Sequence, residues 1–185
     1  MTGINTGNLM SSLVWGNVGA QKNNTSNTDF YVEQNPPPQK GEWAGFAGVQ
    51  NMGGGRSVST SVFMADNYSP DNPVFIVTGT DVDGKNFSVT VNINDVNPKN
   101  ASLIEMSALN AYRSVNGLPR IPSVVFDMRN PEAGLDAARV SNAFEKADFL
   151  TPLLELAAMQ RDNNNWESYF RLKEMTDWLS QFPRP

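Results

Sequence analysis

The chain has 185 residues and a formal net charge of −5, and it contains neither histidine nor cysteine. Without cysteine there are no disulfides, no thiolate nucleophile and no zinc–thiolate or iron–sulfur site. Without histidine the usual general base at neutral pH is missing, which excludes serine–histidine–aspartate and cysteine–histidine catalysis. We therefore expect no cofactor and no metal site. The 14 basic residues are scattered, which argues against nucleic acid as a partner.

Residues 1–56 differ in composition from the rest, and we predict a flexible or loosely ordered arm rich in glycine, asparagine and proline. Residues 1–20 carry no charge, so they lack the basic region of a secretory signal. Three prolines, Pro36 to Pro38, favour an extended chain, and Gly53 to Gly55 suggest a hinge. Because no stretch has the ~20 apolar residues of a membrane helix, we expect no membrane insertion. The default location is the cytoplasm, and export without a leader is the alternative.

Five aromatic residues interrupt this arm at spacings that suit neither a helix nor a strand. They are Trp15, Phe30, Tyr31, Trp43 and Phe46. They are candidate partner-binding residues, since recognition segments often dock through aromatic anchors. The alternative is that they pack against the protein's own domain.

Three strands are predicted between residues 57 and 93. A strand near 57–64 alternates β-branched residues with serines. A hairpin of strands 74–80 and 86–93 follows. Its first strand is apolar on both faces and should be the more buried one. Its second strand places Phe87, Val89, Val91 and Ile93 on one core face.

The turn of this hairpin resembles the start of a calcium loop, because Asp81 and Asp83 are spaced as ligands. The fifth and twelfth positions of such a loop would be Lys85 and Asn92, which cannot supply the required oxygen ligands. Asp83 followed by Gly84 independently favours a hairpin turn. We interpret the segment as a turn.

The next predicted element is a helix over residues 101–116 that covers the hairpin. Ser102 and Glu105 have the spacing of a capping box, and Gly117 ends the helix where a left-handed conformation is required. Ile104, Ala108 and other apolar residues form a wide stripe.

Residues 75–117 resemble a block found in small uncharacterised proteins of Gram-positive bacteria. The resemblance lies in the hairpin and in the runs 92–101 and 105–112. Gly7-Asn8-Leu9 and Trp15-Gly16-Asn17-Val18 near the start are also similar. That family has no known activity, so the resemblance implies no role for any residue.

The C-terminal half is predicted to be mainly helical. A short strand is expected at 123–126, and a helix should begin near Asn130 and Pro131. Val140, Ala143, Phe144 and Ala147 would line one side of that helix. A new helix should begin at Thr151 and Pro152.

A last helix should follow the turn at 162–165, with Asn164 and Glu167 as its capping pair. It holds eight large apolar residues, more than one contact stripe requires. They are Trp166, Tyr169, Phe170, Leu172, Met175, Trp178, Leu179 and Phe182. Trp166 and Trp178 are candidate partner-binding residues on a sticky face, and the alternative is an ordinary core helix.

The sequence therefore predicts an α+β fold with a single domain over residues 57–182, preceded by the arm. We expect a non-catalytic bacterial interaction or structural protein, with an unknown protein partner or self-association. One alternative is a hydrolase that uses paired carboxylates, and another is a leaderless exported or cell-appendage-associated protein. The candidate acids of the hydrolase are Asp127, Glu132, Asp136, Glu155 and Asp177. No catalytic residue is assigned.

Overall fold

The structure is a computed structural model that describes residues 41–122 and 140–184. Trp15, Phe30, Tyr31, the predicted strand 123–126 and the predicted start of the second helix lie outside the described residues. The described chain has four strands and three α-helices and confirms the α+β fold.

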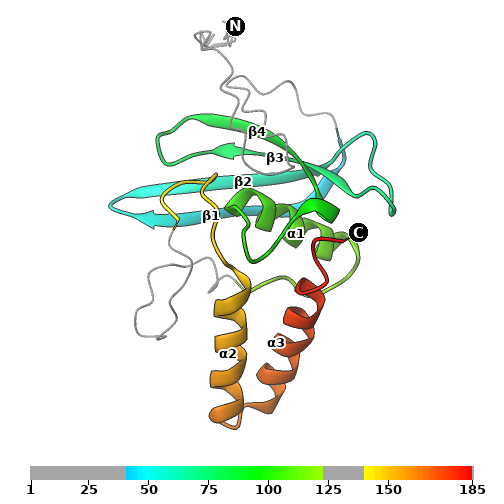
Figure 1. Ribbon diagram of the computed structural model, residues 1–185. Helices are drawn as coiled ribbons and strands as arrows, with labels where there is room; N and C mark the ends of the chain where they lie inside the picture. Colours follow the sequence, from blue (N-terminus) through cyan, green and yellow to red (C-terminus); the bar gives the residue numbers. More distant parts are fainter. Residues whose placement is uncertain (1–40, 123–139, 185) are drawn as a thin grey trace, which may run out of the picture.

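The four strands form one antiparallel sheet in the order β1-β2-β3-β4 (Figure 1). They are β1 (Trp43–Gly53), β2 (Arg56–Met64), β3 (Val74–Thr80) and β4 (Asn86–Asn92). The last three were predicted, but β1 was assigned to the arm. Residues 43–53 belong to the sheet instead. Their alternation is hidden because the register shifts between Trp43 and Phe46, at a bulge where Gly45 has a φ of 73°.

One face of the sheet, the inner face, is the core face predicted from the alternating pattern. Residues paired across the strands share a face, and the registers join Val62 to Val77 and Val77 to Val89. Phe87 and Val91 lie on the same face and are buried. Ser61, Thr78 and Ser88 form a corresponding row on the opposite, outer face.

Helix α1 (Leu103–Val115) lies on the inner face, as predicted (Figure 1). Its capping box is present, since Ser102 Oγ accepts from Glu105 N–H and the Glu105 carboxylate accepts from Ser102 N–H. Gly117 after its C-terminus has a φ of 68°, the conformation in which glycine is favoured. A short 3-10 helix, η1 (Ile93–Asp95), leads from β4 towards it.

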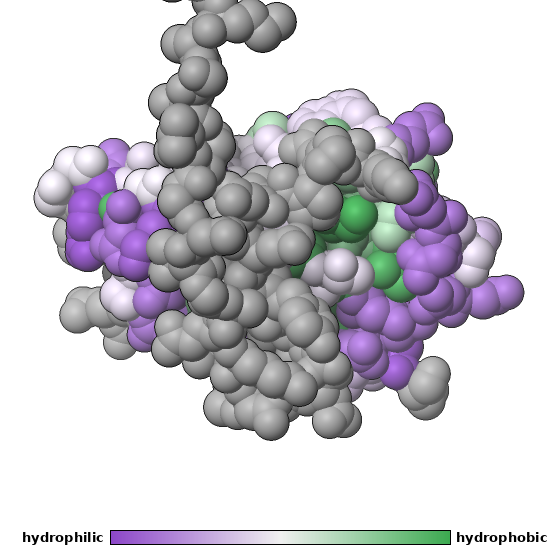
Figure 2. All heavy atoms as spheres, turned by 90° about the horizontal axis from the view of Figure 1, so that it is seen from above, coloured by the Kyte–Doolittle hydropathy of each residue, from purple (hydrophilic) through white to green (hydrophobic). Residues whose placement is uncertain are grey.

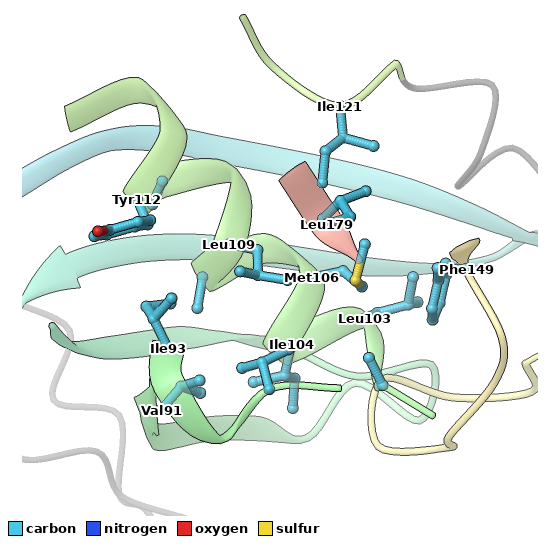
Figure 3. Close-up of a cluster of buried hydrophobic side chains, with 14 of the residues drawn as sticks. Val91, Ile93, Leu103, Ile104, Met106, Leu109, Tyr112, Ile121, Phe149 and Leu179 are labelled. Atoms are coloured by element: carbon cyan, nitrogen blue, oxygen red, sulfur yellow. The ribbon is translucent and has the colours of Figure 1, made fainter. Parts of the chain in front are cut away.

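The other sides of α1 are also covered, so every residue from 103 to 113 is buried. Figure 3 shows side chains converging on the helix from segments beyond the sheet, among them Ile121, Phe149 and Leu179. A wide apolar stripe predicts one contact face, whereas residues 103–113 of the observed helix are buried on every side, and only its last two residues, Ser114 and Val115, are partly or fully exposed.

Polar residues of α1 are buried with specific partners. Ser107 Oγ lies 3.2 Å from Thr60 Oγ1 on β2. Asn110 Oδ1 accepts a hydrogen bond from Ile121 N–H at 2.7 Å. Arg113 Nε donates to the Pro119 carbonyl at 2.6 Å. Each group therefore has a partner where it is shielded from water.

The predicted second helix is absent from its described part, residues 140–149. Asn142 Oδ1 accepts from the amides of Phe144 and Glu145, and Asp81 Oδ1 accepts from Ala143 N–H. Ala147 pairs with Ala101 in an isolated bridge. These contacts occupy backbone groups that a helix would use, so the prediction from apolar spacing was wrong here.

Two helices form a C-terminal hairpin, α2 (Leu150–Asp162) and α3 (Trp166–Leu179). The start of α2 agrees with the prediction, although Asp148 Oδ1 accepts from the amides of Leu150 and Thr151 in place of the predicted cap. The cap of α3 is Asn165 and not Asn164, which has a φ of 57° in the turn.

This hairpin projects from the sheet and α1 (Figure 1). Leu153 and Leu179 at its attached end are buried in the core. At its free end the residues of both helices are half-buried or exposed. The hairpin is therefore anchored at one end.

Candidate functional site

Three aromatic residues gather at the free end of the hairpin, and we call Trp166, Tyr169 and Phe170 the tip cluster. Their ring centroids lie 6.0 Å apart for Trp166 and Tyr169, 6.4 Å for Trp166 and Phe170, and 5.2 Å for Tyr169 and Phe170. Trp166 is 50% exposed and Phe170 is 61% exposed. The rings contact one another but remain open to solvent.

The position of the tip cluster follows from helix geometry. Trp166 is the first residue of α3, and side chains three and four positions later lie on the same side of a helix. Glu167 and Arg171 form an ion pair at 3.0 Å beside the rings. The charges beside the rings therefore cancel. What distinguishes this end of the hairpin is its solvent-exposed apolar surface.

Trp178 lies at the other end of α3 and has different surroundings. Its ring stacks on Tyr112 with a centroid distance of 6.2 Å, and the Arg113 guanidinium lies 4.5 Å from its centroid. Burial lowers the pKa of Arg113 from its usual value. Trp178 thus joins the hairpin to α1 through stacking and cation–π contacts.

Trp43 and Phe46, the other described candidates, lie in β1 on opposite faces of the sheet. Trp43 is 50% exposed and packs edge-on against Phe63 at 5.4 Å. Phe46 packs against the core, with the Arg120 guanidinium 5.8 Å from its ring. The four described candidates therefore occupy separate places. Tyr169 and Phe170 were not predicted as partner-binding residues. Their spacing of three and four residues from Trp166 on a predicted helix is the signal that could have identified them.

An open hollow of about 710 Å³ lies where the start of β1 meets the end of α1. Glu42, Trp43 and Arg120 are among the residues that line it. Arg120 Nη2 donates to the Gly45 carbonyl at 2.7 Å, and its Nε donates to Ser114 Oγ at 3.2 Å. The guanidinium therefore links the two elements.

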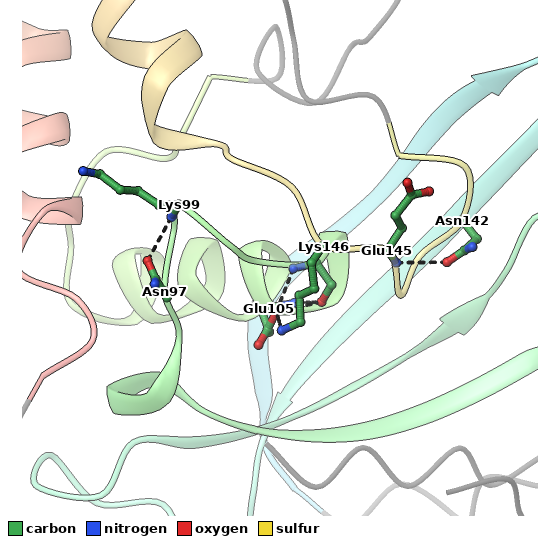
Figure 4. Close-up of polar contacts among 7 residues, drawn as sticks. Asn97, Lys99, Glu105, Asn142, Glu145 and Lys146 are labelled. Atoms are coloured by element: carbon green, nitrogen blue, oxygen red, sulfur yellow. Dashed lines mark hydrogen bonds and ion pairs between the residues drawn. The ribbon is translucent and has the colours of Figure 1, made fainter. Parts of the chain in front are cut away.

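A buried polar cluster lies at the start of α1 (Figure 4). Lys146 forms an ion pair with the Glu105 carboxylate, which is 2% exposed. Ser102 Oγ donates to the same carboxylate at 3.0 Å. A serine and a lysine thus converge here, but Ser102 is fully buried, so no substrate reaches its hydroxyl. The cluster fixes the helix start to the segment around Lys146.

The carboxylates predicted for a hydrolase do not form a pair among the described residues. Glu155 and Asp177 are exposed on different helices, and Asp177 binds Lys173, whose pKa is raised by this hydrogen bond. Asp127, Glu132 and Asp136 lie outside the described residues. In the described segments no group of three acidic side chains is arranged to hold a metal.

Neither of the described segments contains a helix long and apolar enough to cross a membrane. Comparisons with protein-family models, curated proteins and solved structures find no match to this chain.

Proposed function

We propose that the protein is a non-catalytic interaction protein that contacts its partner through the free end of the α2–α3 hairpin. The observation that carries the proposal is the exposure of Trp166 and Phe170 on an element that projects from the folded body. Exposed aromatic residues on a helix or strand of the fold are typical anchors of protein interfaces.

The expected partner is a protein with an apolar groove that accepts both rings. Each aromatic side chain has roughly 150–250 Å² of surface, so the exposed part of each ring is on the order of 100 Å². At about 25 cal/mol per Å², burying that area contributes about 2–3 kcal/mol for each ring. This is the range of an interface hot spot.

The test uses the full chain as bait, with partners captured by crosslinking and identified by mass spectrometry. Trp166→Ala combined with Phe170→Ala should remove the partner that binds the unmodified chain. For a purified partner, Trp166→Ala alone should weaken binding about 30-fold, which corresponds to about 2 kcal/mol. Titration with the purified partner measures this loss.

Trp43→Ala is the matched control, because Trp43 has the same side chain and the same exposed fraction as Trp166. It should leave the partner bound. The proposal is wrong if the doubly substituted chain retains every partner, or if Trp43→Ala removes the same partners as the hairpin substitutions.

A further inference from the structure

The open hollow beside β1 is bordered by groups of opposite charge and by exposed apolar side chains. It measures about 710 Å³, a volume within the range of small-molecule sites. Glu42 and Trp43, next to the start of β1, form one part of its wall, and Val115 and Arg120, from the end of α1 and the segment after it, form another. The described residues that line it include none of α2 or α3, so the hollow is separate from the tip cluster.

Arg120 presents an oriented cation to the hollow. Its Nη2 and Nε donate to the Gly45 carbonyl and to Ser114 Oγ, and its guanidinium lies 5.8 Å from the centroid of the Phe46 ring. A guanidinium has five N–H donors, so three of them have no acceptor within the described segments. Because the side chain is exposed and already held in place, it can bind a carboxylate with little further loss of side-chain entropy.

Glu42 supplies the opposite charge. Its backbone carbonyl accepts from Met64 N–H at 2.8 Å, which holds this residue against the end of β2. Its side chain is exposed and forms no ion pair with Arg120 or with any other described residue. The hollow therefore carries a carboxylate and a guanidinium that do not contact each other, and each can pair with a group of a ligand.

Apolar side chains form the third part of the hollow. The view from above Figure 1 shows hydrophilic residues at both sides of the molecule and hydrophobic atoms near the middle (Figure 2), and six large apolar side chains are exposed in the described segments. Two of these six line the hollow, Trp43 with 50% and Val115 with 40% of its surface exposed. The edge-on contact with Phe63, at 5.4 Å between ring centroids, holds the Trp43 ring. The hollow thus offers apolar contacts beside its two charges.

We infer that this hollow binds a free amino acid with an apolar side chain, in its zwitterionic form. The ligand carboxylate pairs with Arg120, the ligand ammonium pairs with Glu42, and the apolar side chain packs on Trp43 and Val115. The two charges of the ligand cancel, as do those of the hollow, so binding leaves no charge without a partner. A ligand with a single charge would meet a like charge on one wall, which disfavours simple anions and simple cations.

The test follows the binding of free leucine and free phenylalanine to the full chain by NMR titration, which is suited to weak ligands. We expect a Kd on the order of 0.1–1 mM, because the hollow is open and the ligand is small. Leucine amide lacks the carboxylate and N-acetyl-leucine lacks the ammonium. Each should bind about tenfold more weakly than leucine, through the loss of one charge-assisted contact.

Two substitutions assign the two charges. Arg120→Gln should weaken the binding of leucine about tenfold and should not weaken that of leucine amide, which has no carboxylate to lose its partner. Glu42→Gln should weaken the binding of leucine about tenfold and should not weaken that of N-acetyl-leucine, which has no ammonium. Arg56→Gln and Glu155→Gln remove exposed charges outside the hollow and are the matched controls, which should bind leucine as the unmodified chain does.

Arg120→Gln also removes the contacts to Gly45 and Ser114, so circular dichroism checks that this variant is folded. If it is not, Glu42→Gln carries the test, because the Glu42 side chain has no ion pair within the described segments. The inference is overturned if neither amino acid binds the unmodified chain at about 10 mM, or if Glu42→Gln binds leucine with an unchanged Kd. Tighter binding of dileucine than of leucine would also overturn it, since the two charges would then be spaced for a peptide.

Discussion

Helices α1 and α3 have nearly the same length, 13 and 14 residues, but they differ in how much of their surface the protein covers. Residues 103–113 of α1 are all buried, whereas α3 buries only Leu172, Met175, Thr176 and Leu179. The apolar side chains of α1 stabilise the fold. Those at the free end of α3 contribute little to the fold and remain available for contact. The following changes are expected to separate these two roles.

The largest effect is expected from Leu109→Ala in the middle of α1. Leu109 is fully buried, so truncation should lower the free energy of unfolding by about 2–5 kcal/mol through lost burial and a residual cavity. Urea unfolding measures this change. Leu154→Ala, on the exposed side of α2, is the matched control and should cost less than about 1 kcal/mol. Equal losses would show that the hairpin is as tightly packed as the body.

The next effect concerns the ion pair at the start of α1. Glu105→Gln preserves size but replaces the charged acceptor of the Lys146 and Ser102 hydrogen bonds by a neutral amide, which should cost about 1–3 kcal/mol. Chemical denaturation of the two proteins gives the difference. Glu155→Gln removes an exposed acid from α2 and should change stability by less than about 0.5 kcal/mol. An unchanged free energy of unfolding in Glu105→Gln would show that the ion pair does not stabilise the fold.

A smaller effect on stability is expected at the tip cluster. Trp166→Ala with Phe170→Ala removes ring contacts that are largely open to water, so the free energy of unfolding should fall by about 1 kcal/mol or less. Thermal unfolding followed by circular dichroism provides the measurement. A loss comparable to that of Leu109→Ala would mean that these rings serve the fold, which would remove the basis for a contact role.

The smallest effect is a pH dependence in the irregular segment before the hairpin. Hydrogen bonds from the Ser141 hydroxyl and amide lower the pKa of Glu145 below its usual value of 4.5. Because the folded-state pKa is the lower one, the stabilisation is present above the unfolded-state value and is lost as the pH falls through the folded-state pKa. Melting temperatures of the unmodified chain and Glu145→Gln should therefore converge as the pH drops below 4.5, and a constant difference would contradict this.

The elements predicted correctly from the sequence are those whose local pattern matches the face that the fold buries. Strands β2 to β4 and the start of α1 combine regular alternation or a capping pair with burial of the expected face. Strand β1 was missed because Gly45 and its bulge interrupt the alternation. The helix predicted through Ala143 failed because its side-chain and backbone contacts are made to distant residues, such as Asp81.

The candidate site was predicted only in part. Trp166 was named from the excess of apolar residues on α3, but spacing alone could not distinguish an exposed end from an attached end. Trp178 is also a tryptophan of α3, yet it packs against Tyr112. The difference arises from where the hairpin joins the body, which depends on contacts between segments far apart in the sequence.

The buried polar residues of α1 have a consequence for how the fold selects a single arrangement. Apolar side chains alone would allow a helix to turn about its axis or slide along it with small losses. Ser107, Asn110 and Arg113 bind partners outside the helix, Thr60 on β2 and residues Ile121 and Pro119 of the segment after α1. A turn of one residue would break all three contacts, and Asn110 and Arg113 would lose these hydrogen bonds at about 1–3 kcal/mol each. These three polar contacts can form together in only one rotation and one axial position of α1, so they select that arrangement.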